Sequence, residues 1–142
     1  MSRYAIRRHM SVSVHSVTSR HTLAEAHQAM RERGVRHLPV IDDGKLVGVV
    51  SQRDLYLLET LKGVDAAREL VEEAMTSEPY VVGPDAPLDE VAEQMAQRRH
   101  GSALVLEGDT IVGIFTTTDA LRALVVVLRK GRRGRDEPDD DA

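Results

Sequence analysis

The sequence predicts an α/β (α+β) protein built from two copies of one β-α-β-β-α unit, and three observations support this. One pattern (Gly, two apolar residues, a hydroxyl residue, two variable residues, Asp) occurs at 48–54 and again at 113–119. A shift of 65 residues aligns 10–54 with 75–119 without a gap and with ten identities. Each copy also places a helical pattern before two short β-rich runs. Together these indicate an internal duplication.

Each unit is expected to begin with an extended piece, 14–17 or 80–82, followed by a helix. In the first unit Thr22 with Glu25 three residues later is the pattern of a capping box, and Gly34 is a stop signal. In the second unit Pro87 stands near the helix start. The apolar faces share helical spacing and comprise Leu23, Ala26, Ala29 and Met30 in the first helix and Leu88, Val91 and Met95 in the second.

A hairpin and a further helix complete each unit. Runs 37–41 and 46–50 are joined by the turn 42–45, and runs 103–106 and 111–115 by the turn 107–109. Helices are expected to begin at Ser51 and Thr116. Between the units, 64–75 has the composition of a linking helix.

The expected organisation is therefore an N-terminal arm (1–9), unit one (10–63), a linking helix (64–74), unit two (75–128) and a charged tail (129–142). The tail carries five basic and five acidic residues in separate blocks. Low hydrophobicity with segregated charge predicts disorder past about Gly131.

Composition excludes several classes of protein. The 142-residue chain has no cysteine, which rules out a disulfide framework, a thiol nucleophile and Cys-ligated zinc. Aromatic residues make up 3% and the net charge is −4, which argues against single-strand stacking platforms and general phosphate-backbone binding. No apolar run is long enough to span a membrane, and the first eight residues lack the apolar stretch of a secretory signal. We therefore expect a cytoplasmic protein with no membrane contact and no metal.

The repeated unit resembles the CBS domain, named after cystathionine β-synthase. The resemblance covers about Met10 to Leu128 and rests on the stretch 35–48, the two Gly-x-x-Ser/Thr-x-x-Asp motifs and the preamble 75–82. It implies a tandem pair, or Bateman module, whose units pack pseudo-symmetrically through their sheets and leave two clefts. Each cleft is expected to bind an adenosine derivative such as AMP, ADP, ATP or S-adenosylmethionine. Two such modules are expected to form a disc-shaped homodimer.

The two motifs carry chemistry that fits such a ligand. A helix N-terminus favours anions, so Ser51 and Thr116 would face phosphate. Asp54 and Asp119, one turn further on, would accept hydrogen bonds from ribose hydroxyls, and Arg53 adds a cation. The same pattern is also that of an ordinary helix cap, and a cap and a binding site are compatible.

The resemblance further implies that each cleft is completed by the other unit. The group Thr76, Tyr80, Gly101 and Ser102 would close over Ser51, Arg53 and Asp54. The group Ser11, His15, Arg36 and His37 would close over Thr116 and Asp119. Because Thr118 stands where the first motif has Arg53, the clefts are unequal, and the Arg53 cleft is favoured for a phosphorylated ligand.

The expected function is a non-catalytic sensor that needs no cofactor and signals to an effector the sequence does not identify. Two alternatives remain: a ligand-free structural or dimerisation module, and a regulator contacting nucleic acid through its basic termini, which the charge disfavours. Neither motif contains a Cys or His nucleophile or base. IMP dehydrogenases carry inserted CBS domains, but their barrel takes about 250 residues. The helix 121–128 is apolar almost all round, as expected for burial between two subunits.

Overall fold

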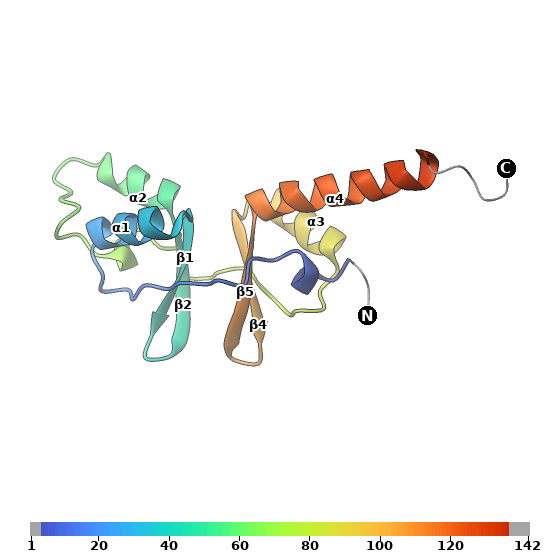
Figure 1. The fold of residues 1–142 in the computed structure, drawn as a ribbon. Coiled ribbons are helices and arrows are strands. Elements are labelled where there is room, and N and C mark those ends of the chain that lie inside the picture. The colour runs from blue at the N-terminus through green and yellow to red at the C-terminus, as the bar shows by residue number, and fades with distance from the viewer. Residues whose placement is uncertain (1–3, 137–142) are drawn as a thin grey trace.

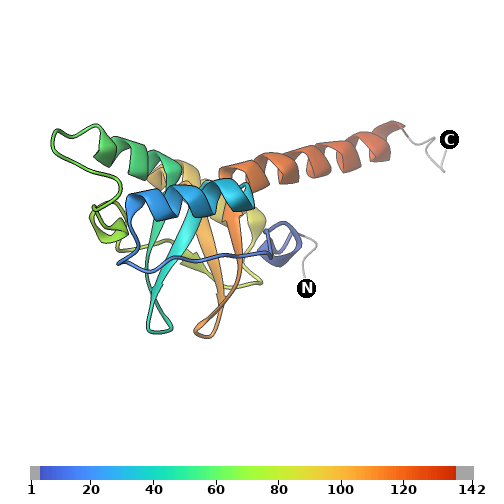
Figure 2. The ribbon, with the colours of Figure 1, turned by 60° about the vertical axis from the view of Figure 1, so that its left-hand side comes forward.

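A computed structural model describes residues 4–136 and contains two similar units side by side (Figures 1 and 2). Their sheets lie next to each other at the centre of the molecule, and the helices flank them. The first unit contains α1 (Leu23–Arg33), β1 (His37–Asp42), β2 (Lys45–Ser51) and α2 (Gln52–Glu59). The second contains β3 (Val81–Val82), α3 (Leu88–Arg98), β4 (Ser102–Glu107), β5 (Thr110–Thr116) and α4 (Thr117–Asp136). The 3₁₀ helices η1 (Ile6–Arg8) and η2 (Val71–Glu73) precede the units.

The sheets repeat one register. β1 pairs with β2 and β4 with β5, both antiparallel, and both hairpins shift register at positions 65 residues apart, after Val40 and after Val105. β3 lies parallel to β4, whereas the first unit has only a bridge from Val17 to Val40 at the corresponding place. The predicted order is thus complete in the second unit, and the first strand of the first unit is reduced to one bridged residue.

The local signals for helix ends are confirmed. Thr22 and Glu25 form a capping box at the start of α1, and Gly34 ends that helix in the left-handed conformation with φ of 64°. Pro87 occupies the position before α3 without a side-chain hydrogen bond, and the helix ends at Arg99 with φ of 57°, a conformation that is uncommon for a residue with a side chain.

Each unit has its own hydrophobic core, and the segment before each unit packs into the core of the other. Ile6 of η1 is fully buried in the second unit's core, and Val71 of η2, 65 residues later, is fully buried in the first unit's core. Figure 1 shows the blue N-terminal segment running from the second unit across to α1. The expected N-terminal arm is therefore an integral part of the second unit from residue 4 onward.

The predicted linking helix at 64–74 is wrong: this stretch contains turns and only the short η2. Some of its backbone groups pair with one another in turns, and others pair with the start of the first unit. The amides of Leu23 and Ala24 donate to the carbonyls of Glu69 and Ala66, and the amide of Val71 donates to the carbonyl of His21. The segment thus satisfies the free N–H groups of the first turn of α1, and this tertiary pairing overrides its helix propensity.

The predicted disorder past Gly131 is also wrong for the described residues, because α4 continues to Asp136, and residues 137–142 lie outside the described part. Arg and Lys are good helix formers and are favourable near a helix C-terminus. The C-terminal half of α4 extends away from the body in both views (Figures 1 and 2). Among the described residues, no helix is long and apolar enough to cross a bilayer.

The crossed packing gives a first prediction. Replacing Ile6 with alanine should lower the free energy of unfolding by about 2–5 kcal/mol, because it leaves a cavity in the second core. Val12, which is 72% exposed in the same N-terminal segment, provides the control: Val12→Ala should change stability by less than about 0.5 kcal/mol. Urea unfolding measures both, and equal small effects would contradict the assignment of Ile6 to the core.

Candidate functional site

Both Ser/Thr-x-x-Asp motifs form caps at helix N-termini. At α2 the amide of Ser51 donates to Asp54 Oδ2 at 2.9 Å, and the amide of Asp54 donates to Ser51 Oγ at 3.1 Å. At α4 the amide of Thr116 donates to Asp119 Oδ2 at 2.9 Å. The capping interpretation is therefore confirmed at both motifs. In each motif the cap uses Oδ2 of the carboxylate and leaves Oδ1 for other partners.

A cavity of about 780 Å³ lies beside the first motif, between the two units. All seven residues expected to form the first cleft line it: Ser51, Arg53, Asp54, Thr76, Tyr80, Gly101 and Ser102. A bridge between Val49 and Thr76 holds the preamble of the second unit against the first sheet. Segments from both units thus line the same cavity, as predicted.

The charged residues that line this cavity are mostly cationic. They are Arg36, Arg53 and Arg99, against a single acidic residue, Asp54. Arg36 and His37, which were expected at the other motif, line this cavity, because β1 begins opposite the end of β2, where His37 pairs with Ser51. The Asp119 carboxylate of the other motif also acts on the His37 imidazole. The cavity therefore attracts anions more strongly than Arg53 alone indicated.

Sequence reasoning missed Arg99 and His100. The shift of 65 residues places Arg99 on Gly34, so an arginine occupies a left-handed helix end where glycine is the usual residue. The arginine in place of the expected glycine is the signal that could have identified Arg99 from the sequence. His100 stacks on Tyr80 with ring centroids 5.2 Å apart and planes inclined by 17°. Burial raises the pKa of Tyr80, so its phenol stays neutral.

His37 lies at the contact between the units. An added Cβ on Gly101 would lie 2.8 Å from His37 Nε2, so a side chain at this position would force the imidazole to move. Burial lowers the pKa of His37; the nearby Asp54 and Asp119 carboxylates oppose this lowering, and the guanidinium of Arg36 adds to it. The imidazole is therefore neutral near pH 7.

This burial predicts a pH dependence of stability. Because the pKa of His37 is lower in the folded chain than its unfolded value of about 6.5, the unfolded chain takes up this proton first as the pH falls. His37 should therefore reduce stability as the pH falls below about 7, until the pH passes its folded pKa. Urea unfolding at pH 7.5 and 5.5 should show a smaller loss for His37→Gln than for the wild type, and an equal loss would contradict the prediction.

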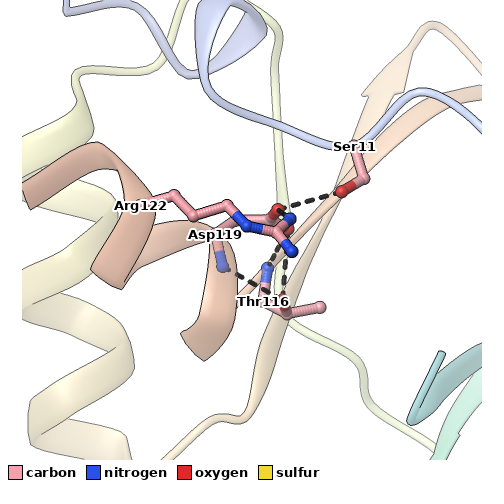
Figure 3. Close-up of polar contacts among 4 residues, drawn as sticks. All are labelled: Ser11, Thr116, Asp119 and Arg122. Atoms are coloured by element: carbon pink, nitrogen blue, oxygen red, sulfur yellow. Dashed lines mark hydrogen bonds and ion pairs between the residues drawn. The ribbon is translucent and has the colours of Figure 1, made fainter. Parts of the chain in front are cut away.

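The second motif has a different environment, shown in Figure 3. Ser11 Oγ donates to Asp119 Oδ1 at 2.9 Å, and Arg122 Nη1 lies 3.6 Å from the same oxygen. Asp119 is only 4% exposed. The structure brings Ser11, Thr116 and Asp119 together. His15 Nε2 lies 3.4 Å from Ser13 Oγ. Within residues 4–136 no group of three His, Asp or Glu side chains could hold a metal ion.

Comparison with known proteins matches two segments, 5–58 and 71–126, to the CBS domain. The chain is 29% identical over 110 residues to the CBS domain-containing protein YhcV of Bacillus subtilis, covering 78% of each. It is 35% identical over 105 residues to an inosine-5'-monophosphate dehydrogenase of Korarchaeum cryptofilum, covering 73% of this chain but only 21% of that protein. The chain thus spans about a fifth of that enzyme's length.

Two solved structures are similar over most of the chain. The CBS domain pair of protein MJ0100, in complex with 5'-methylthioadenosine and S-adenosyl-L-methionine, has a TM-score of 0.78 and 25% identity, covering 87% of this chain and 97% of that one. CBSX2 in complex with AMP has a TM-score of 0.72 and 27% identity, covering 89% and 99%. With both family matches and the duplicated fold, the chain belongs to the CBS domain family and carries a tandem pair of these domains.

Proposed function

We propose that this CBS pair is a non-catalytic regulatory module of the cytoplasm that binds a phosphorylated adenosine derivative in the Asp54 cavity. The observation that carries the proposal is the composition of that cavity: three guanidinium groups, a helix N-terminus and one carboxylate around about 780 Å³. Similar CBS pairs bind AMP or S-adenosyl-L-methionine, which supports an adenosine ligand here.

In the proposed complex, the two ends of the ligand bind different groups. Asp54 Oδ1 accepts ribose hydroxyls, while Arg53, Arg36 and Arg99 bind phosphate together with the N-terminus of α2. Since the lining comes from both units, a bound ligand favours the arrangement in which they are closed. It shifts the population only by its differential affinity for that arrangement, and a partner protein would sense the result.

The charge of the cavity orders the candidate ligands. S-adenosylmethionine carries a sulfonium, an ammonium and a carboxylate group, so its net charge is positive and the three arginines repel it overall. AMP, ADP and ATP carry phosphates, which the same arginines attract. Nucleotides are therefore proposed ahead of S-adenosylmethionine.

Calorimetric titration with AMP, ADP, ATP, NAD and S-adenosylmethionine tests the proposal. Saturable binding of at least one phosphorylated ligand, tighter than that of S-adenosylmethionine, is expected. If no ligand bound up to millimolar concentration while the protein remained folded, the alternative of a ligand-free structural module would replace this proposal.

We also propose that the module forms a homodimer through α4. Leu121, Leu124, Val125 and Leu128 form one exposed apolar row at helical spacing, each 43–59% exposed. Light scattering after size exclusion should give twice the mass of the chain at micromolar concentration. Leu124→Asp should give the monomer, whereas Val12→Asp, a charge placed on an exposed residue outside α4, should leave the dimer intact. A monomeric wild type would contradict this proposal.

A further inference from the structure

The two motif carboxylates have different partners, although they occupy equivalent positions of the repeat. Asp54 is half-buried and lines the open cavity, with its cap to Ser51 made through Oδ2. Asp119 is buried, and its Oδ1 accepts the hydroxyl of Ser11 in addition to the cap made through Oδ2. The oxygen that is available for a ligand in the first motif is thus already hydrogen-bonded in the second.

The side chains around the two carboxylates are arranged differently. Ser11 and Thr76 are equivalent by the shift of 65 residues, but Thr76 lines the cavity, whereas Ser11 turns its hydroxyl to Asp119 (Figure 3). Arg122 stands where the first unit has Leu57, and its guanidinium faces the same carboxylate oxygen. The cation beside the second motif therefore comes from a position one turn further along its helix, whereas Arg53 is at the start of α2 and lines the open cavity.

Ser11 is also fixed through its backbone. Its amide donates to the carbonyl of Ile114 at 2.8 Å, and its carbonyl accepts from the amide of Ile114 at 2.9 Å. This bridge ties Ser11 to β5. The Ser11 hydroxyl is therefore already held beside Asp119 before any ligand binds. A ribose hydroxyl would have to displace a buried hydrogen bond to a charged group, which lowers affinity by about 10- to 100-fold.

We infer that the hydroxyl of Ser11 occupies the ribose-binding position of the second motif and so restricts ligand binding to the Asp54 cavity, one nucleotide per chain. This inference rests on the proposed function. Ser11 thereby determines which of two related motifs accepts a ligand, and removing its hydroxyl should expose a second nucleotide site at Asp119.

Calorimetry with AMP tests the inference through stoichiometry. The wild type should bind one AMP per chain, and Ser11→Ala should bind a second. In an Asp54→Asn background, which removes the first site, adding Ser11→Ala should restore binding of one AMP, and a further Asp119→Asn should abolish it. Circular dichroism confirms that each variant is folded.

The outcomes separate the inference from the proposed function. Two AMP molecules per wild-type chain, or no gain from Ser11→Ala in either background while the wild type binds one, would overturn the role of Ser11 alone. No binding of AMP, ADP or ATP by the wild type would overturn the proposed function and this inference together. A gain of one site that depends on Asp119 would support both.

Discussion

Asp54→Asn is expected to weaken AMP binding by about 100-fold or more. Each hydrogen bond to a charged group contributes about 1.5–3 kcal/mol, and the carboxylate of Asp54 is proposed to accept bonds from ribose hydroxyls. Asparagine keeps a carbonyl oxygen that can accept from the amide of Ser51, so the start of α2 should persist. Calorimetric dissociation constants for the wild type and the variant measure the effect.

Asp119→Asn is the matched control, because it makes the same chemical change at the equivalent position of the repeat. Since Asp119 lies outside the Asp54 cavity, the affinity for AMP should change by no more than about twofold. If the two variants lost affinity equally, or if only Asp119→Asn did, the assignment of the ligand to the Asp54 cavity would be wrong.

Gly48→Ala is expected to destabilise the protein by at least about 1–3 kcal/mol, the usual effect of overpacking. An added Cβ would lie 2.6 Å from the carbonyl oxygen of Thr76 and 2.9 Å from Met75 Sδ. Thr76 cannot retreat easily, because its carbonyl accepts from the amide of Val49 at 3.0 Å and its amide donates to the carbonyl of Val49 at 2.8 Å. Urea unfolding measures the loss.

The same substitution should also weaken AMP binding, since Thr76 lines the cavity. Gly83→Ala is the control: no atom lies within 4 Å of its added Cβ, and its φ is not in the left-handed region. Its stability should change by less than about 0.5 kcal/mol. A Gly48→Ala variant as stable as Gly83→Ala would show that the contact between the second preamble and β2 is loose.

The features that could be predicted from the sequence depend on neighbouring residues or on the repeat. The capping pairs Thr22–Glu25 and Ser51–Asp54 act within one helical turn, so their residue types suffice to place the helix starts. The seven residues of the first cleft follow from the resemblance and from the shift of 65 residues, and the structure brings them to one cavity.

The errors concern segments whose conformation depends on distant partners. The stretch 64–74 has helix-forming composition, but the carbonyls of Ala66 and Glu69 accept from amides at the start of α1, and no local pattern reveals such pairing. Arg36 and His37 were expected only at the second motif, yet they line the Asp54 cavity, because the edge of β1 lies beside its own unit's α2 as well as at the contact between units. For example, the amide of Gln52 donates to the carbonyl of Arg36 at 2.8 Å.

The exchange of Ile6 and Val71 between the cores makes the two halves mutually dependent. A fragment ending in the loop around Gly63 would retain Ile6 but lack the second core that buries it, and its own core would lack Val71. The complementary fragment would have the opposite deficit. Neither half should fold alone, yet mixing them should reconstitute the native pair without a covalent link. After the duplication, each unit therefore came to depend on the other for a complete core.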